Sequence, residues 1–311
     1  MKKAIIDLGT NTFHLMIVEG EPGQYDTLFR ESRPAKIGKA GINQGFITDE
    51  AIERALAVLQ YFREKLDHFQ VPEAQVTAMG TSAIRNAANQ EAFLDRIVRQ
   101  TGIRVQVISG EEEATYIYRG VRAAGALDNR TALIMDIGGG SVEFILCQRD
   151  RIFWKQSFEI GGQRLMERYM DGSPERPDPI SPAAVRKLHH YLDQQLLPLR
   201  NAVHQYRPAL LVGSSGTFDT LVDMHYQYLR QQWPPAEQTT FELPVEEFYR
   251  SYALLLSRNH ADRLAIPGMI ELRVDMIVVA VCLIDYVLRA FGIGDIRVST
   301  YALKEGVLFN E

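Results

Sequence analysis

Apolar residues along the chain recur with two different periods, one typical of strands and one typical of helices. Short apolar runs at residues 3–8 and 12–19 predict a hairpin, and residues 26–38 predict a further strand that leads into a glycine-containing loop. An amphipathic helix is predicted to begin after Thr48. Its apolar positions recur at helical spacing and are Ile52, Leu56, Leu59, Phe62 and Leu66.

Strands and helices continue to alternate along the rest of the chain. The predicted strands are residues 75–80, 104–109, 132–137, 141–148, 151–160 and 296–300, with a strand and turn at 209–217. The predicted helices are residues 90–101, 111–124, 182–206, 245–258 and 273–291, with a short helix at the C-terminal end. Such alternation is typical of an α/β layer architecture.

An internal repeat predicts that this architecture is duplicated. The segments AIIDLGTNTFHLMIVEG and LIMDIGGGSVEFILCQR align without a gap, so that Asp7 corresponds to Asp136. Each segment opens one half of the chain. We therefore expect two domains, residues 1–124 and 125–311, that face each other across a cleft. We expect that the last helix of the chain can pack back on the first domain.

The second copy of the repeat places three successive glycines, Gly138 to Gly140, between Asp136 and Glu143. A hairpin turn alone would explain one or two of them. Three beside a strand-terminal aspartate favour a phosphate-binding loop, because glycine lets backbone amides approach a phosphate oxygen closely. Mg²⁺ prefers one or two carboxylates together with phosphate oxygens and water. We therefore predict that the glycines bind phosphate and that the two acids hold the metal.

Composition excludes several classes of protein. The 311 residues are 46% hydrophobic and 23% charged, as in globular proteins, which excludes disorder and collagen-like repeats. The formal net charge of -5 argues against DNA binding through bulk positive potential. Cys147 and Cys282 are too few for a disulfide framework or a structural zinc site. We expect a cytoplasmic protein without a membrane partner, because the apolar run at 276–284 is too short to span a bilayer.

Five segments, in order, resemble the motifs of the exopolyphosphatase and guanosine pentaphosphate phosphohydrolase (Ppx/GppA) family, within the actin-like ATPase superfold. They are DLGTNTFHLMI at 7–17, GTSAIRNAAN at 80–89, VISGEEEA at 107–114, DIGGGSVEF at 136–144 and GSSGT at 213–217. The resemblance extends over essentially the whole chain. It implies two ribonuclease H-like domains with a cleft between them, and hydrolysis of terminal phosphoanhydride bonds with Mg²⁺, or Mn²⁺ in its place, in a homodimer.

Three consecutive acids, Glu111 to Glu113, follow Ser109 at the start of a predicted helix. Ser109 and Glu112 have the spacing of a capping box, and Glu111 favours the helix dipole. Glu113 has no such local role. By resemblance it matches the family's catalytic glutamate, which would orient or deprotonate the attacking water. The alternative is an ordinary acid on a helix surface.

The resemblance also assigns phosphate and metal ligands. Arg85 and Arg273 match arginines that contact phosphate, for which a planar guanidinium is well suited; the alternative for a lone arginine is a solvated surface position. The substrate-binding residues predicted in this way are Arg85, Gly138, Gly139, Gly140, Ser141, Ser215, Gly216, Thr217, Arg273, Thr10 and Asn11. The catalytic residues are Glu113, Asp136 and Glu143, and the metal ligands are Asp136, Glu143 and Asp7.

Some positions depart from the family pattern or stay open. Lys36 and Lys304 stand where arginine is common, and Ala280 stands where glycine is frequent. Lysine keeps the charge but lacks the paired donors of arginine, so these departures bear on substrate preference more than on the reaction. His14 corresponds to Glu143 in the repeat, and either points into the cleft or packs within its strand.

The leading hypothesis from the sequence is a phosphoanhydride hydrolase that releases orthophosphate from inorganic polyphosphate, with guanosine pentaphosphate as the second substrate. Phosphoryl transfer depends mainly on positioning and charge neutralisation, which glycine turns, arginines and carboxylates supply. Two hypotheses of other classes remain. One is an ATP-dependent kinase of the same superfold, and the other is a sensor that binds a phosphorylated alarmone or polyphosphate without hydrolysing it.

Overall fold

Two β-sheets form the framework of the protein, which a computed structural model describes for residues 1–21, 24–170 and 172–309. The strands of the first sheet are β1 (Lys2–Leu8), β2 (Thr12–Glu21), β3 (Gln24–Pro34), β4 (Val76–Gly80) and β5 (Val105–Val107). Their order is β3-β2-β1-β4-β5. The first three strands form an antiparallel meander, and β4 and β5 continue the sheet parallel to β1.

The second sheet repeats this plan. Its strands are β6 (Ala132–Ile137), β7 (Val142–Gln148), β8 (Arg151–Phe158), β9 (Leu210–Ser214), β10 (Thr240–Glu242) and β11 (Ile296–Ser299). The order β8-β7-β6-β9-β11 matches that of the first sheet, and β10 is added at the edge, antiparallel to β11. The predicted fold of two ribonuclease H-like domains is therefore confirmed.

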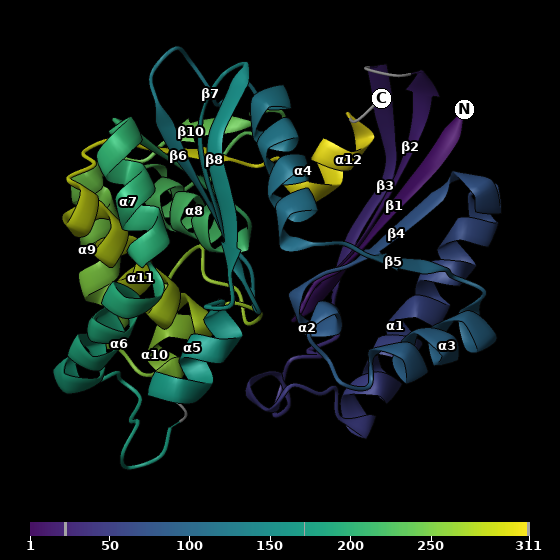
Figure 1. Ribbon diagram of the computed structural model, residues 1–311, viewed down its shortest axis with the longest axis horizontal. Coiled ribbons are helices and arrows are strands. Elements are labelled where there is room, and N and C mark those ends of the chain that lie inside the picture. Colours follow the sequence, from purple (N-terminus) through teal and green to yellow (C-terminus); the bar gives the residue numbers. More distant parts are fainter. Residues whose placement is uncertain (22–23, 171, 310–311) are drawn as a thin grey trace.

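The helices of the first half divide between the two faces of its sheet (Figure 1). Helices α1 (Asp49–His68) and α3 (Gln90–Thr101) cover the face that points away from the second sheet. Helix α1 begins after Thr48, as predicted, because the Thr48 hydroxyl accepts a hydrogen bond from the amide of Ala51. A short helix α2 (Ser82–Arg85) follows β4 directly, and a 3₁₀ turn η1 (Ile42–Gln44) lies in the loop before α1.

Two helices far apart in the sequence lie between the sheets (Figure 1). They are α4 (Gly110–Ala123) and α12 (Leu303–Leu308). A Cβ atom on Gly306 would lie 1.7 Å from the carbonyl oxygen of Tyr116, so the two helices cross with their backbones in contact. Helix α4 also packs on β7 and β8 of the second sheet. The division of the chain at residue 125 stays a prediction, since α4 belongs by its contacts to both halves.

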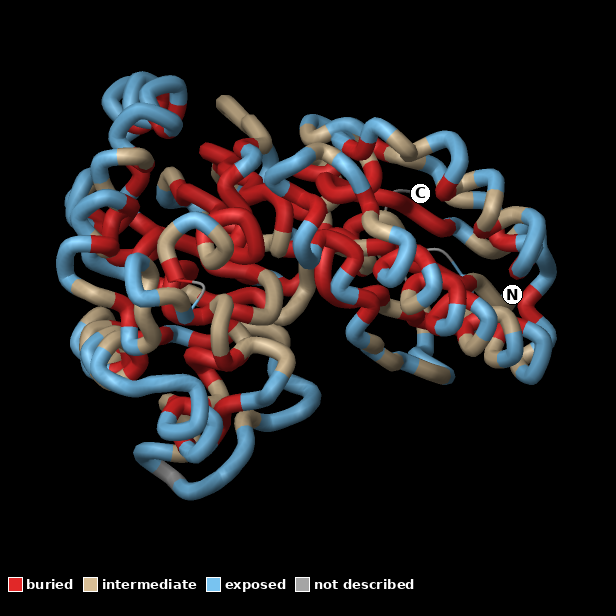
Figure 2. Tube along the Cα trace, turned by 90° about the horizontal axis from the view of Figure 1, so that it is seen from below, coloured by how far each residue is buried: buried red, intermediate tan, exposed pale blue. Residues whose placement is uncertain are grey.

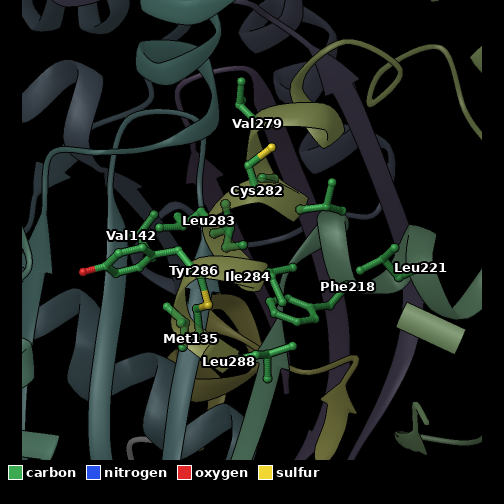
Figure 3. Packing of buried hydrophobic residues seen from close by; sticks show 14 of the residues in the cluster. Met135, Val142, Phe218, Leu221, Val279, Cys282, Leu283, Ile284, Tyr286 and Leu288 are labelled. Carbon is green, nitrogen blue, oxygen red and sulfur yellow. The ribbon is translucent and has the colours of Figure 1, made fainter. Parts of the chain in front are cut away.

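The outer face of the second sheet carries the remaining helices. They are α5 (Gly162–Tyr169), α6 (Pro182–Gln195), α7 (Leu197–Tyr206), α8 (Gly216–Arg230), α9 (Val245–Ser257), α10 (His260–Leu264) and α11 (Met276–Phe291). Every residue of α11 from 277 to 288 is buried. A helix that is apolar all round is stable only inside a core. Figure 3 shows its residues Val279, Leu283 and Ile284 packed among side chains of β6 and α8.

Three apolar clusters make up the core, one outside each sheet and one between them. The cluster between the sheets joins Ile5 of β1 and Ile134 of β6 with Ile117 of α4 and Leu303 of α12. Figure 2 shows the buried backbone running through both lobes, with exposed residues on the outer helices. Among the described residues, no helix combines the length and hydrophobicity that a membrane span requires.

The structure corrects the predicted elements in a few places. The helix predicted at 182–206 is two helices that meet at Leu196, because Pro198 has no N–H to continue the first. Helices α5 and α8 and strand β10 were not predicted. Helix α8 begins at Gly216, inside the segment interpreted as a turn, so the GSSGT motif joins the end of β9 to the start of a helix.

Candidate active site

Equivalent hairpins of the two sheets bring the predicted acids to the centre of the molecule. In each hairpin the repeat places a cross-strand pair, Asp7 opposite His14 and Asp136 opposite Glu143. Directly opposed residues of antiparallel strands project from the same face of a sheet. Asp136 and Glu143 are buried, with 7% and 1% of their surface exposed. The two acids flanking the glycines therefore share one face next to the turn.

The two turns of the repeat are in contact with each other. A Cβ atom on Gly139 would lie 2.5 Å from the Asn11 side-chain nitrogen, and one on Gly140 would lie 2.6 Å from the Thr10 hydroxyl. Both positions therefore require glycine. In the part of the chain that the structure describes, the amides of Gly139 and Gly140 donate no hydrogen bond. Amides without internal partners beside hydroxyl and amide side chains are the features of an anion-binding turn.

A cavity of about 300 Å³ opens between the halves at these turns. Most of the predicted site residues line it, and these are Asp7, Thr10, Asn11, Glu113, Asp136, Gly138, Gly139, Gly140, Ser141, Ser215, Gly216 and Arg273. Three others lie just outside its wall. Thr217 is buried in the first turn of α8, Glu143 is the cross-strand partner of Asp136, and Arg85 donates to Glu113.

Glu113 is buried against a cation. Only 7% of its surface is exposed, and the Arg85 Nη1 donates to its Oε2 over 2.8 Å. Burial raises the pKa of Glu113 to about 7, although the Arg85 guanidinium opposes the shift. Ser109 and Glu112 form the capping box that the sequence predicted, so the Glu113 carboxylate is not used in capping the helix.

The carboxyl groups around the cavity have raised pKa values, because burial and neighbouring negative charges disfavour their ionised form. Burial raises the pKa of Asp7 to about 6, and Asp136 adds to the shift. Burial likewise raises the pKa of Asp136, which accepts a hydrogen bond of 2.6 Å from Ser214. Burial and the neighbouring Glu113 hold the pKa of Glu143 well above its usual range, and Ser157 donates to its Oε1 over 2.7 Å. This arrangement favours a bound cation or protons.

Two cationic side chains, those of Arg273 and Lys304, line the cavity. The Arg273 guanidinium packs against the start of α8, because a Cβ atom on Gly216 would lie 2.0 Å from its Nη2. Burial lowers the pKa of Arg273 while Asp219 and Asp136 oppose this shift. Ser215, which precedes the helix, has a φ of 73°, a strained value for a residue with a side chain.

His14 lies on the cavity wall, which settles the alternative left open by the sequence. Its Nδ1 lies 2.6 Å from the hydroxyl of Ser32. Burial lowers the pKa of His14 well below its usual value, and the nearby Lys304 and Arg273 add to the shift. His14 is therefore a neutral residue of the cavity at physiological pH.

Several residues of this region were not predicted from the sequence. Asp219 and Asp223 of α8 line the cavity, and burial raises their pKa values to about 7 and about 6. Since α8 was not predicted, no pattern pointed to them. Glu159, between β8 and α5, contacts the start of α2, and Arg164 of α5 contacts the glycine turn. Arg164 has other charged residues nearby in the sequence, so no local pattern pointed to it.

Comparison with known proteins is consistent with this geometry. The model of the Ppx/GppA phosphatase family matches residues 16–311. The chain belongs to this family. It is 45% identical to an exopolyphosphatase from Cytophaga hutchinsonii, whose crystal structure it matches with a TM-score of 0.93 over 99% of this chain and 97% of the other. A Ppx/GppA protein from Aquifex aeolicus is 25% identical, with a TM-score of 0.79 over 99% and 96% of the two chains.

A longer relative is also similar to this chain. It is a bifunctional 3-dehydroquinate synthase/phosphatase from Fusobacterium nucleatum, 26% identical over 98% of this chain. The chain spans 46% of the length of that protein. The family predicted from the five motifs is therefore confirmed, and membership supports a phosphatase activity.

Proposed function

We propose that this Ppx/GppA family member hydrolyses the terminal phosphoanhydride bond of inorganic polyphosphate and releases orthophosphate. The observation that carries the proposal is the contact between the two turns of the repeat, where the amides of Gly139 and Gly140 donate no hydrogen bond among the described residues. This anion-binding turn lies in the same cavity as the buried Glu113. The similarity to an exopolyphosphatase from Cytophaga hutchinsonii supports a polyphosphate substrate.

The side chains suggest how the reaction is assisted. The terminal phosphoryl group would bind the Gly139 and Gly140 amides and the hydroxyl of Thr10, with Arg273 and Lys304 reducing its charge. Glu113 would orient the water and accept its proton, since a pKa of about 7 is close to the pH at which a base works best. Positioning and charge neutralisation account for most catalysis of phosphoryl transfer.

The donor set fits Mg²⁺. Among the described residues, no group of three metal-ligating side chains forms a complete cage. Mg²⁺ does not require one, because it is usually held by one or two carboxylates together with phosphate oxygens and water. Asp136 and Asp7, whose pKa values are raised by burial, would hold the ion together with Glu143, the cross-strand partner of Asp136. The ion would neutralise charge on the transferred phosphoryl group.

Guanosine pentaphosphate is the second candidate substrate, and part of the cavity lining favours it. Ile270 and Leu272 contribute apolar surface to the cavity, and Asp219 contributes a carboxylate. Apolar contact for a ring and an acceptor for its N–H groups are what a guanine base requires. The kinase and sensor hypotheses have no comparable support. Dimerisation and a cytoplasmic location stay predictions.

Phosphate release measured in parallel from long-chain polyphosphate, guanosine pentaphosphate and ATP tests the proposal. We expect polyphosphate to have the highest kcat/KM, with guanosine pentaphosphate second and ATP last. A preference for guanosine pentaphosphate would select the second candidate. Turnover of ATP alone, or binding without turnover of any of the three, would overturn the proposal.

A further inference from the structure

Glu159 bridges the two halves of the molecule beside the active site. It lies between β8 and α5, and its carboxylate receives three donors. The Ser82 hydroxyl donates to Oε2 over 2.6 Å, and the Arg164 Nη2 donates to the same oxygen over 2.9 Å. The Arg85 Nη2 approaches Oε1 at 3.4 Å. Ser82 and Arg85 belong to α2 of the first half, whereas Glu159 and Arg164 belong to the second.

These three donors are the kind that bind a phosphate group. A hydroxyl and two guanidinium groups converge on one anion, which is the usual composition of a phosphate site. Arg164 is held in place independently of Glu159, because its Nε donates to the Gly140 carbonyl over 2.9 Å and its Nη1 to the Ile42 carbonyl over 2.7 Å. It is buried, with 9% of its surface exposed. The anion site is therefore built into the fold.

The position of this site relates it to the path of a substrate. Ser82 lines the reaction cavity, and Arg85 lies behind its wall, with Nη1 on Glu113 and Nη2 on Glu159. Arg85 and Glu159 also line a second, more open hollow together with Ser157. Glu159 thus stands between the cavity and that hollow. A phosphate chain that extends from Ser82 past Arg85 would meet this carboxylate, which both residues contact.

We propose that Ser82, Arg85 and Arg164 form a second anion subsite, and that Glu159 occupies it as an internal competitor, so that long polyphosphate binds less tightly than it would without this carboxylate. The inference rests on the proposed function and adds a determinant of chain length to it. A short substrate bound at the glycine turns meets Ser82, which lies next to Gly140, but does not extend to Arg164. A long one must displace Glu159, whose side chain is 42% exposed and free to move into solvent.

Kinetics on two substrates test the inference. For Glu159→Ala we expect KM for long-chain polyphosphate to fall by about tenfold, the worth of one charge-assisted contact regained by the substrate. The kcat values and the KM for tripolyphosphate should stay within about twofold of wild type, which is less than the worth of such a contact. Glu159→Gln removes the charge but keeps the shape, so its shift should be smaller and in the same direction.

Glu167 provides a matched control at the same interface. It lies on α5 and accepts hydrogen bonds from the Ala40 amide over 3.1 Å and from the Asn43 side chain over 3.0 Å, across the two halves. Glu167→Ala therefore loosens the interface without touching the subsite. We expect it to leave the ratio of KM values for the two substrates unchanged. If both variants changed the ratio of KM values equally, or if Glu159→Ala changed KM equally for both substrates, Glu159 would only hold the two halves together. Either result would overturn the inference.

Binding separates this inference from the proposed function. Calorimetry with Mg²⁺ present, on proteins that also carry Glu113→Gln, measures the affinity for tripolyphosphate and for long-chain polyphosphate with little turnover. Tighter binding of the long chain to Glu159→Ala supports the subsite even if the wild-type protein hydrolyses no polyphosphate. Unchanged binding of the long chain overturns the inference even if hydrolysis is confirmed.

Discussion

The guanidinium group of Arg85 lies 2.8 Å from the carboxylate of Glu113, so the expected phosphate ligand and the expected base are paired with each other. Their side chains are 17% and 9% exposed, so the pair is shielded from water and from salt. A phosphate group that binds Arg85 would draw charge away from Glu113 and leave its carboxylate more basic. Substrate binding and the basicity of Glu113 are thus coupled through Arg85.

This pair predicts the effect of Arg85→Ala. The change removes a phosphate ligand and leaves Glu113 buried without its cation, so KM should rise and the pKa of Glu113 should move further above about 7. A base works only when deprotonated, so the acid limb of the kcat profile should move to higher pH. A matched control is Arg99→Ala, because the Arg99 side chain is 78% exposed. An Arg85→Ala enzyme with a normal KM and pH profile would place Arg85 outside the mechanism.

Arg273 is expected to act on affinity alone. It lines the cavity but, within the described part of the chain, makes no ion pair with Glu113. Arg273→Ala should therefore raise KM and make binding less sensitive to salt, without moving the pH profile. The measurement is the salt dependence of KM in parallel with the pH profile. Unchanged KM at every salt concentration would contradict a phosphate-binding role.

Metal removal provides a test of the donor set. Two acids and a polyanion repel one another without a cation, so activity should be lost in excess chelator and return with Mg²⁺ or Mn²⁺. Asp136→Asn should lose metal-dependent substrate binding while keeping its fold. Asp223→Asn, which alters another acid of the cavity, is the control and should keep metal dependence. Full activity in chelator would rule out the metal.

The raised pKa of Asp7 predicts that the free energy of unfolding depends on pH. Its pKa is raised in the folded state from 3.8 to about 6, so the fold favours the protonated acid. Wild-type stability is therefore lost as pH rises from about 4 to about 6, by up to about 3 kcal/mol. Asp7→Asn mimics the protonated acid and should be more stable than wild type at pH 7, in chelator, but not at pH 4. Denaturant unfolding at both values measures the difference, and equal stability differences would contradict the shift.

The sequence was most informative where local pattern and chemistry agree. The repeat placed Asp7 and Asp136 at equivalent positions, because a gap-free alignment of two strand pairs leaves little freedom in register. The capping box at Ser109 and Glu112 left Glu113 without a local role, and the resemblance to the family's motif singled it out. Each inference used a short local pattern, a strand pair in one case and one helical turn in the other.

Contacts between polar residues that are far apart in the chain could not be predicted from the sequence. Glu159 meets Ser82 across 77 positions, and nothing in either local pattern signals the other. Helix α8 was missed because its first residues, GSSGT, carry the small polar residues of a turn, and the close approach of Arg273 to Gly216 exists only in the folded chain. Such contacts arise from packing of the two halves rather than from local preference.

The crossing of α4 and α12 predicts a stability effect that also reaches the site. A Cβ atom on Gly306 would lie 1.7 Å from the Tyr116 carbonyl, a backbone atom that cannot yield easily, so Gly306→Ala should destabilise the protein by about 1–3 kcal/mol. Its activity should also fall, because α12 carries Lys304 into the cavity. Gly294→Ala is the control, since its Cβ atom meets nothing within 4 Å. Equal melting temperatures in the two variants would contradict the tight crossing.

Glu113→Gln tests the assignment of the base. Glutamine forms helices as well as glutamate does and can still accept from Arg85, so the fold and substrate binding should be retained. It cannot take a proton from water, so kcat should fall by about 10² to 10⁴, the usual worth of a general base.

Glu112→Gln is the internal control, one residue away. Glu112 accepts from the Ser109 amide over 2.8 Å, a role that glutamine also fulfils in a capping box, so its turnover should stay close to wild type. Phosphate release under saturating substrate compares the two variants directly. The neighbouring residues have different tasks because the Glu113 side chain lines the cavity whereas that of Glu112 is used at the helix start. Equal losses of turnover, or a Glu113→Gln enzyme with near-normal kcat, would rule out Glu113 and direct the search for a base to Asp7.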